Sequence, residues 1–311
     1  MKIVIPGGSG QVGQILKRGL ARNGHEVVIV GRGTDADAEW NGRSGGPWTR
    51  HVDGADVVIN LAGRSVNCRY GAKNRREILE SRVDSAHAVG DAIAAAAKPP
   101  RVWLQASTAT IYAHRYDAPN DDVTGIIGAD EPNAPDTWRF SIVVAKAWER
   151  AALEAVVPGT RVVRMRSAMV MSPDAGGIFD TLLTLVRRGL GGTSGDGRQY
   201  VSWIHEHDFV RAVEWLIAHD ELTGAVNLAA PNPLPNRDFM RALREARGTR
   251  IGLPSMRWML EIGAFLMGTE TELVLKSRRV VPRRLLDSGF TFQYETWADA
   301  ARELAARARQ R

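Results

Sequence analysis

The feature that most constrains this chain is a glycine-rich turn that follows its first apolar run. The run Lys2–Ile5 has the composition of a buried strand, and the spaced glycines come directly after it. In such a turn, Gly7 permits the tight bend, Gly10 lets backbone approach a pyrophosphate, and Gly13 lets the next helix pack closely on the strand. The N–H groups and positive dipole at the start of that helix also attract phosphate. The turn predicts a dinucleotide-binding domain, with cofactor-binding residues Gly7, Ser9, Gly10, Gln11, Val12 and Gly13.

The first 170 residues alternate apolar runs with longer helical patterns, which is typical of a parallel sheet with crossover helices. The runs are apolar nearly throughout, as in strands that are buried on both faces. The predicted strands are Lys2–Ile5, Glu26–Val30, Val57–Asn60, Arg101–Ala106 and Arg161–Arg166. The predicted helices are Val12–Asn23, Lys73–Ala97 and Phe140–Glu154. The fold class that follows is α/β, a Rossmann-type doubly wound parallel sheet.

The alternation is interrupted twice and then changes. Tyr116–Trp138 is rich in Asp, Asn, Pro and Gly, and Gly189–Gly197 is dense in glycine, so both predict surface loops. Beyond three prolines after residue 230, helical patterns follow at Arg237–Arg247 and Met256–Met267. These patterns predict a smaller, mainly helical C-terminal domain that caps the substrate. The expected organisation is a NAD(P)-binding domain over 1–230, with a cap insertion at about 169–200, and a cap domain over 231–311.

Composition excludes several classes of protein. With 44% hydrophobic and 24% charged residues, the chain has the balance of an ordinary globular protein. The single cysteine, Cys68, rules out a disulfide framework and fits a reducing compartment. No apolar stretch approaches the ~18 residues that span a bilayer, and the short N-terminal apolar run is no signal peptide, so we expect a cytoplasmic protein without membrane contact. The net charge of +6 favours anionic partners, but no aromatic interleaving accompanies it, so nucleic acid is not an expected partner.

The residue after the second predicted strand bears on which dinucleotide binds. An acidic side chain at that place would accept hydrogen bonds from the ribose hydroxyls of NAD. This chain has Gly31 and then Arg32 instead. A guanidinium group binds a 2′-phosphate through two parallel, charge-assisted hydrogen bonds. We therefore predict NADP(H) as the cofactor in preference to NAD(H), and a surface arginine without a ligand is the alternative.

With these motifs in order along the chain, the sequence resembles the extended short-chain dehydrogenases/reductases. It is similar in particular to their atypical branch of NAD(P)-dependent sugar-nucleotide epimerase-like proteins, which ends in a small domain of unknown function. The resemblance runs nearly end to end. Besides the glycine turn, it is carried by Asn60-Leu61-Ala62-Gly63, Glu80-Ser81-Arg82-Val83, Ser107-Thr108-Ala109-Thr110-Ile111-Tyr112, Ala147-Trp148-Glu149, Trp203-Ile204-His205 and Arg279-Val280-Val281-Pro282.

The resemblance adds candidate cofactor contacts. Leu61-Ala62-Gly63 would pass close to the adenosine, where small residues permit contact, and Ser107 would lie among the cofactor-binding residues. Arg82, on the long central helix, would reach a cofactor phosphate or a substrate carboxylate. Its alternative is an ion pair with Glu80 or Glu149.

The resemblance also implies catalytic residues, and here the pattern is incomplete. Thr108 would orient a substrate oxygen, and Lys146 would hold the nicotinamide ribose and lower the pKa values of its neighbours. The family's acid–base residue is a tyrosine four residues before the lysine. Counting back from Lys146 gives Ile142, which cannot transfer a proton.

Several side chains are alternatives to the missing tyrosine. Tyr112 is the nearest phenol in sequence, although a structural role is the better interpretation of it. Ser141 neighbours the vacant position, and His114 or Tyr116 would come from the long loop. None of them is favoured strongly by the sequence.

A metal site is not predicted, because His205, His207 and Asp208 have no third spaced ligand elsewhere in the sequence. The predicted function is an NADP(H)-dependent oxidoreductase or epimerase that acts on a small or nucleotide-linked polar substrate. The alternative, motivated by Ile142, is a non-catalytic NADP(H)-binding sensor or scaffold. A homodimer through the two long helices is the expected assembly, because members of the superfamily commonly pair in this way.

Overall fold

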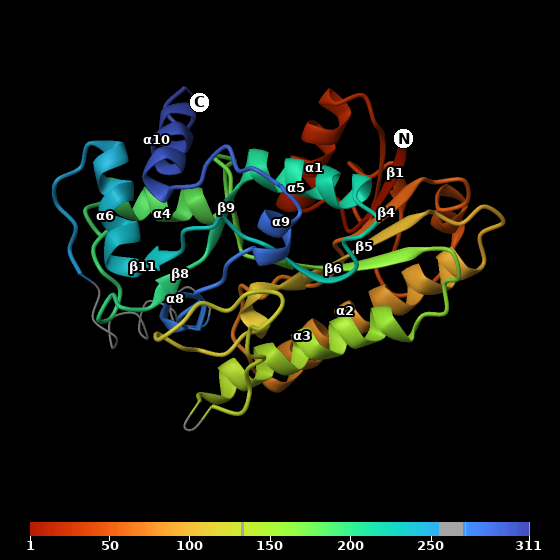
Figure 1. The fold of residues 1–311 in the computed structure, drawn as a ribbon, viewed down its shortest axis with the longest axis horizontal. Coiled ribbons are helices and arrows are strands. Elements are labelled where there is room, and N and C mark those ends of the chain that lie inside the picture. The colour runs from red at the N-terminus through yellow and green to blue at the C-terminus, as the bar shows by residue number, and fades with distance from the viewer. Residues whose placement is uncertain (132–133, 255–269, 271, 311) are drawn as a thin grey trace.

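The computed structural model describes residues 1–131, 134–254, 270 and 272–310. Its centre is a seven-stranded parallel sheet with the strand order β10-β6-β5-β4-β1-β2-β3 (Figure 1). From β1 the chain builds outward to β3 on one side and to β6 on the other, which is the doubly wound arrangement. The strands of the sheet are β1 Lys2–Pro6, β2 Glu26–Gly31, β3 Ala38–Glu39, β4 Val57–Asn60, β5 Val102–Thr108, β6 Arg161–Ser167 and β10 Gly224–Leu228.

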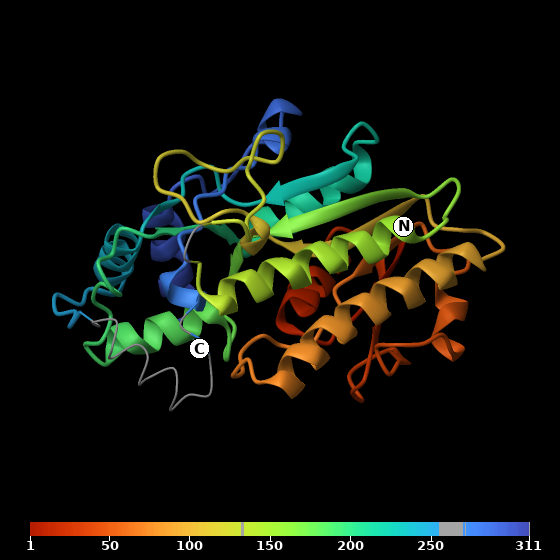
Figure 2. The ribbon, with the colours of Figure 1, turned by 90° about the horizontal axis from the view of Figure 1, so that it is seen from below.

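Helices cover both faces of this sheet because its strands are apolar on both faces. Alternate strand residues enter two separate cores, as Ile3 and Val4 do on β1. One core is shared with α1 (Gln11–Arg22) and α5 (Glu206–Ala218). The other is shared with α2 (Ala72–Ala94) and α3 (Asp136–Glu154), which run side by side across the sheet in Figure 2.

The five predicted strands are confirmed, each within two residues of its expected bounds. Two strands of the sheet were missed, namely β3 and β10. The predicted loop Tyr116–Trp138 is too long by three residues, because α3 begins at Asp136. The carboxylate of Asp136 in the first helical turn faces the positive end of the helix dipole, and it is also paired with Arg75.

A third core joins the segment after β6 to the C-terminal part of the chain. Helices α4 (Ile178–Arg187), α6 (Asn236–Arg247) and α10 (Trp297–Arg307) pack around Trp203 and Trp297 at one end of the sheet (Figure 1). The predicted helix Arg237–Arg247 is confirmed as α6, whereas Met256–Met267 lies outside the described residues. The predicted boundary at residue 230 stays a prediction.

Short elements connect these layers. Strand β7 (Met169–Met171) pairs with β9 (Trp203–His205), and β8 (Tyr200–Val201) pairs with β11 (Leu234–Pro235). The remaining described elements are the 3-10 turns Pro47–His51 and Ala109–Ile111, α8 (Glu272–Leu275) and α9 (Arg283–Asp287). Isolated β-bridges also join loop segments. Within the described ranges, no helix combines the length and apolar character that a membrane crossing requires.

Candidate cofactor and active site

A cavity of about 400 Å³ lies beyond the carboxyl ends of β1, β2 and β4, where the order of the strands reverses. In open α/β sheets, ligands bind at this switch point. The cavity brings together the segments that follow these three strands and part of α2. Its lining includes the predicted cofactor residues Gly7, Ser9, Gly10, Arg32, Leu61, Ala62 and Gly63.

The glycines of the turn have different physical roles. Gly7 has a φ of +79°, and a Cβ there would collide with the backbone of Ala62. A Cβ on Gly13 would collide with the backbone of Gly8, so Gly13 allows the helix to pack on the turn. A Cβ on Gly10, by contrast, would meet nothing closer than 4.0 Å. Packing within the protein does not require glycine at position 10, and the free space there lies at the cavity.

The start of α1 fits a phosphate group. Gly10 is the N-cap residue and supplies no side-chain cap, and the first turn carries no acidic residue. The backbone N–H groups at this end are therefore available to an anion, and the helix dipole favours negative charge. The predicted contacts Gln11 and Val12 lie in this turn but not in the cavity lining. Val12 packs against the core, and the side chain of Gln11 faces Gly177.

Two exposed arginines line the same cavity. Arg32 makes no hydrogen bond or ion pair with another described residue, so its guanidinium group is available to a ligand. Arg43 contributes a second guanidinium group, held 3.7 Å from Glu80. The sequence reasoning missed Arg43 because it lies in an irregular segment without a recognisable motif. Together the two cations make this part of the cavity suitable for a phosphate dianion.

A second cavity, of about 120 Å³, lies between α2, α3 and the segment that follows residue 270. Thr108, at the end of β5, is part of its lining, and its role in orienting a substrate oxygen stays a prediction. The Thr108 hydroxyl accepts a hydrogen bond from the backbone N–H of Thr110 at 3.1 Å. Three aromatic side chains form much of the wall, namely Tyr70, Phe140 and Trp148.

The face of α3 that lines this cavity differs from the one expected. Ser141, Ala145 and Trp148 share the lining face, as residues spaced by four and three positions do on a helix. Lys146 is exposed, and it belongs to the lining of neither cavity. Ile142 is 1% exposed and packs toward Gly128. The cavity face of α3 is thus offset from Lys146 by one helical position, a rotation of about 100°, and the cofactor-binding and catalytic role of Lys146 stays a prediction.

Tyr112 is held in a buried hydrogen-bond network. Its hydroxyl donates to Asn227 Oδ1 at 2.8 Å and accepts from Arg166 Nη1 at 3.0 Å. Burial raises the pKa of Tyr112 above its ordinary value, although Arg166 opposes the shift. Arg166 also binds the buried carboxylate of Glu149, which accepts a hydrogen bond from Ser107 at 2.6 Å. The hydroxyl groups of Tyr112 and Ser107 are therefore already engaged within the protein, and the catalytic role of Tyr112 and the cofactor contact of Ser107 stay predictions.

Arg82 lies in the second cavity and not beside the glycine turn. Its Nη1 donates hydrogen bonds of 3.0 Å to the carbonyl oxygens of Arg64 and Ile78, and its guanidinium group lies over the ring of Trp148. Burial lowers the pKa of Arg82 to about 10. The alternative ion pair of Arg82 with Glu80 or Glu149 does not form, because these carboxylates pair with other arginines. The side chain instead forms part of the floor of the cavity with a largely buried positive charge.

The C-terminal part of the chain supplies a carboxylate that the sequence reasoning missed. Glu272 is 1% exposed and lines the second cavity, where its Oε2 accepts a hydrogen bond of 2.6 Å from the Ser141 hydroxyl. Arg278 lines the cavity from the same segment and donates from Nε to Thr110 Oγ1 at 3.1 Å. Lys276 donates to the Thr110 carbonyl oxygen at 2.8 Å. These contacts fasten the C-terminal segment over the end of β5.

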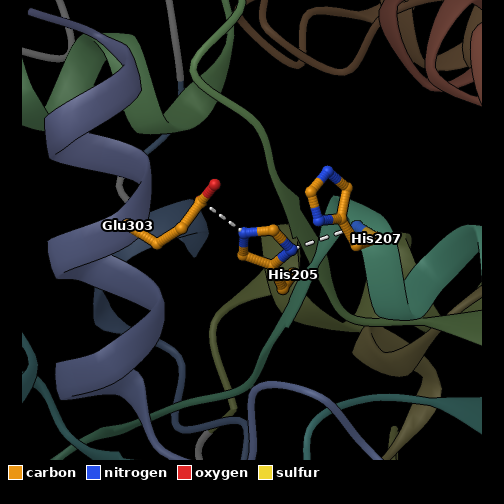
Figure 3. A group of neighbouring side chains, drawn as sticks. All are labelled: His205, His207 and Glu303. Carbon is orange, nitrogen blue, oxygen red and sulfur yellow. Dashed lines mark hydrogen bonds and ion pairs between the residues drawn. The ribbon is translucent and has the colours of Figure 1, made fainter.

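A cluster of possible metal ligands lies away from both cavities. Figure 3 shows His205 between the carboxylate of Glu303 and His207, and the ligand-capable atoms of the three lie within 4.8 Å of one another. The reasoning that no third ligand exists was therefore wrong, because α10 brings in Glu303 from 98 residues away. His205 Nδ1 accepts a hydrogen bond from the His207 backbone N–H at 3.1 Å, so Nε2 carries the proton and donates to Glu303 at 2.9 Å. Both ring nitrogens are engaged, and the cluster ties α10 to the start of α5.

Comparison with known proteins agrees with this geometry. The model of the NAD dependent epimerase/dehydratase family matches residues 3–229, and a domain of unknown function (DUF1731) matches residues 257–304. An epimerase family protein of Mycobacterium leprae is 32% identical over 304 residues, which are 96% of this chain and 94% of that protein. The epimerase family protein SDR39U1 of Bos taurus is 31% identical and covers 98% of this chain and 100% of its own.

A solved structure shows the same fold. The crystal structure of human epimerase family protein SDR39U1 (isoform 2) with NADPH superposes on this chain with a TM-score of 0.85 at 27% identity. The match covers 98% of this chain and 99% of the human one. The family resemblance and the Rossmann-type fold class expected from the sequence are confirmed. The chain belongs to the NAD dependent epimerase/dehydratase family.

Proposed function

We propose that this protein is an NADP(H)-dependent oxidoreductase or epimerase of the extended short-chain dehydrogenase/reductase type. The observation that carries the proposal is the cavity at the switch point, where the open space at Gly10 and the unpaired Arg32 match a pyrophosphate and a 2′-phosphate. The human relative whose structure includes NADPH supports the choice of cofactor.

In this proposal the first cavity binds the cofactor and the second binds the substrate. The start of α1 and the glycine turn would hold the pyrophosphate, while Arg32 and Arg43 would hold the 2′-phosphate. The bound nicotinamide would supply or accept a hydride. Thr108 and Ser141 place two hydroxyl groups in the second cavity, where they would orient a substrate oxygen. The enclosed, largely apolar wall would keep water from the reacting atoms.

The alternative function is a non-catalytic NADP(H)-binding sensor or scaffold. It is favoured by the face of α3 that lines the second cavity, because Ser141 and Ala145 stand there without a tyrosine or a lysine. We favour the enzyme, because a binding protein would not require a second cavity that contains hydroxyl and carboxyl groups.

Cofactor choice is tested by measuring NADPH and NADH binding to the wild type and to Arg32→Ala, for example by calorimetry. Loss of a charge-assisted contact weakens NADPH binding by about 1.5–3 kcal/mol, or about 10- to 150-fold, and leaves NADH binding nearly unchanged. Arg22→Ala, an exposed arginine at the far end of α1, is the matched control and should bind both dinucleotides normally. An unchanged preference in Arg32→Ala would refute the assignment.

Turnover is tested by following the absorbance of reduced nicotinamide with ketones, aldehydes and sugar nucleotides as substrates. Oxidation of NADPH with one of these classes supports the enzyme. Tight NADPH binding without any turnover favours the sensor. The cytoplasmic location and the homodimer are further proposals, and the exposed apolar side chains Val143 and Leu153 on α3 support a paired surface there.

A further inference from the structure

The carboxyl group of Glu272 has one oxygen that its surroundings do not satisfy. Its Oε2 is held by the Ser141 hydroxyl, but Oε1 is buried and has no hydrogen-bond partner within the described part of the chain. Arg278 Nη2 stands 3.9 Å from Oε1, beyond hydrogen-bond distance. Leaving a buried polar atom without a partner costs free energy, so Oε1 has the capacity to form a hydrogen bond with a bound molecule.

The position of Glu272 suggests which molecule would supply a hydrogen-bond partner for Oε1. Glu272 lies in the wall of the second cavity together with Thr108 and Ser141. Ser141 stands on the cavity face of α3, where the fold leaves room for an acid–base side chain but the sequence provides only a short hydroxyl. A substrate oxygen that enters the cavity would give Glu272 Oε1 the partner it lacks.

The electrostatic surroundings favour Glu272 over Tyr70, the phenol among the described residues of the cavity wall. Burial raises the pKa of Glu272 above its ordinary value, while Arg278, Ser141 and Lys276 oppose the shift and Glu270 adds to it. This direction moves a carboxyl group toward neutral pH, where general acids and bases work best.

The pKa of Tyr70 is also raised, but for a phenol this direction leads away from neutral pH. Burial and the charge of Glu272 raise the pKa of Tyr70 to about 12, although Ser141 and Arg278 lower it. A phenol with that pKa exchanges its proton poorly at neutral pH. Tyr70 therefore serves the cavity as an aromatic wall.

The size and the lining of the cavity define the substrate. An apolar protein cavity of about 150 Å³ holds one benzene molecule. The second cavity, at about 120 Å³, thus accepts a group of roughly six heavy atoms and is too small for a nucleoside diphosphate. Most of its exposed surface is apolar, and its polar lining residues include Thr108, Ser141 and Glu272 together with Arg82 and Arg278. These properties fit a small, mostly apolar molecule with one carbonyl or hydroxyl oxygen.

We propose that Glu272 is the acid–base residue of the second cavity, and that it exchanges a proton through Oε1 with the oxygen of a small, largely apolar ketone or aldehyde, or of the corresponding alcohol. Ser141 is the positioning residue, because its hydrogen bond to Oε2 fixes the orientation of the carboxyl group. The proposal rests on the proposed function, and it replaces the polar substrate expected from the sequence by an apolar one.

The proton and electron balance is complete with NADPH as the reductant. In the reducing direction, the carbonyl carbon gains a hydride and the carbonyl oxygen gains the proton of the neutral Glu272 carboxyl group. The products are the alcohol, NADP⁺ and the Glu272 carboxylate, which regains its proton from water. In the oxidising direction the carboxylate accepts the hydroxyl proton as the hydride leaves.

The first test follows the proton directly, in protein with NADPH bound, by infrared spectroscopy of the protonated carboxyl group as a function of pH. The wild type should show a carboxylic acid band that persists to higher pH than that of a surface glutamate. Glu272→Gln should lack this band, and Glu26→Gln, an exposed glutamate, should keep it. Ser141→Ala should shift the band and its titration, and Ser141→Thr should restore both. Absence of a Glu272 band, or no response to Ser141→Ala, would overturn the proposal.

The second test measures turnover with cyclopentanone, benzaldehyde and UDP-glucose as probes. The wild type should oxidise NADPH with a carbonyl probe and not with UDP-glucose. Glu272→Gln should lower kcat by about 10²- to 10⁴-fold with little change in KM, and should remove the fall in rate at high pH that deprotonation of Glu272 causes in the reducing direction. Normal kcat in Glu272→Gln, turnover of UDP-glucose alone, or no turnover of any probe would overturn the proposal.

NADPH affinity distinguishes a failure of the proposed function from a failure of the role proposed for Glu272. If the wild type does not bind NADPH, the proposed function itself fails. If it binds and Glu272→Gln binds equally well, the variant is folded and its turnover tests Glu272 alone. If Glu272→Gln fails to fold, the infrared and kinetic responses of Ser141→Ala and Ser141→Thr decide the proposal.

Discussion

Gly7 and Ala62 lie in such close contact that no side chain fits between them. Gly7 has a left-handed backbone conformation, and a Cβ on it would come within 2.8 Å of the Leu61 carbonyl carbon and closer still to Ala62. The contact joins the turn after β1 to the end of β4, and it fixes the floor of the cofactor cavity. Gly10 is in the same turn but faces open space.

Substitution of these two glycines should therefore have opposite effects. Gly7→Ala should lower the free energy of unfolding by about 1–2 kcal/mol from backbone strain alone, with a further cost from the collision. Gly10→Ala should leave the melting temperature nearly unchanged and weaken NADPH binding, because its methyl group takes the place of a phosphate. Thermal unfolding and NADPH titration of both variants check this. A melting temperature that falls equally in both would contradict the distinction.

The buried network around Glu149 should dominate one part of the pH dependence of stability. Burial raises the pKa of Glu149, but the hydrogen bonds and charges of Arg166, Ser107 and Arg164 outweigh it and hold the pKa below its ordinary value. Because the folded pKa is depressed, this stabilisation is present above the unfolded value and is lost as the pH falls through the folded value.

Removal of that charge provides the measurement. Glu149→Gln should reduce the free energy of unfolding at pH 7 by roughly 3–5 kcal/mol, because Arg166 is left buried without its partner. It should also flatten the loss of stability below about pH 4. Denaturant unfolding of the wild type and of Glu149→Gln between pH 3 and pH 7 gives the free energy of unfolding of each protein as a function of pH. Parallel curves would exclude a contribution of Glu149 to the pH dependence.

Lys146→Ala should bind NADPH with the affinity of the wild type, since Lys146 is exposed and lines neither cavity. The same titration with Arg32→Ala provides the positive control. A large loss of affinity in Lys146→Ala would mean that the side chain reaches the cofactor and would restore the original motif assignment.

Treatment with a chelator should leave the melting temperature unchanged, because both nitrogens of His205 are already engaged in hydrogen bonds. Glu303→Gln should lower the melting temperature with or without chelator, since it weakens the contact that ties α10 to His205. A stabilising response to added Zn²⁺ in the wild type, absent in Glu303→Gln, would instead assign a metal to the cluster.

The parts of the fold that could be predicted are those in which burial alone determines the sequence pattern. Strands that are buried on both faces are apolar throughout, so β1 and β4 stand out in the sequence. The glycine turn was predictable because its spacing reflects contacts within a single βα unit. Strand β3 has only two residues, Ala38 and Glu39, and is too short to show any pattern.

The candidate site was predictable only where it is local. The order of motifs along the chain indicated a site on α3, but it did not show which helical face turns toward the cavity. An alignment of the motif on α3 that is shifted by one residue selects Ile142 and Lys146, whereas Ser141 and Ala145 face the cavity. Glu272 could not be predicted at all, because its partner Ser141 is 131 residues away and the hydrogen bond between them depends on the docking of the C-terminal segment.

The separation of Ser141 from Glu272 has a consequence for biosynthesis. The central sheet is complete in sequence at Leu228, before Glu272 has been made. A nascent chain can therefore form the nucleotide-binding half first, since domains generally fold in the order in which they leave the ribosome. On the proposed function, a prematurely terminated chain would keep the residues of the first cavity and lack Glu272.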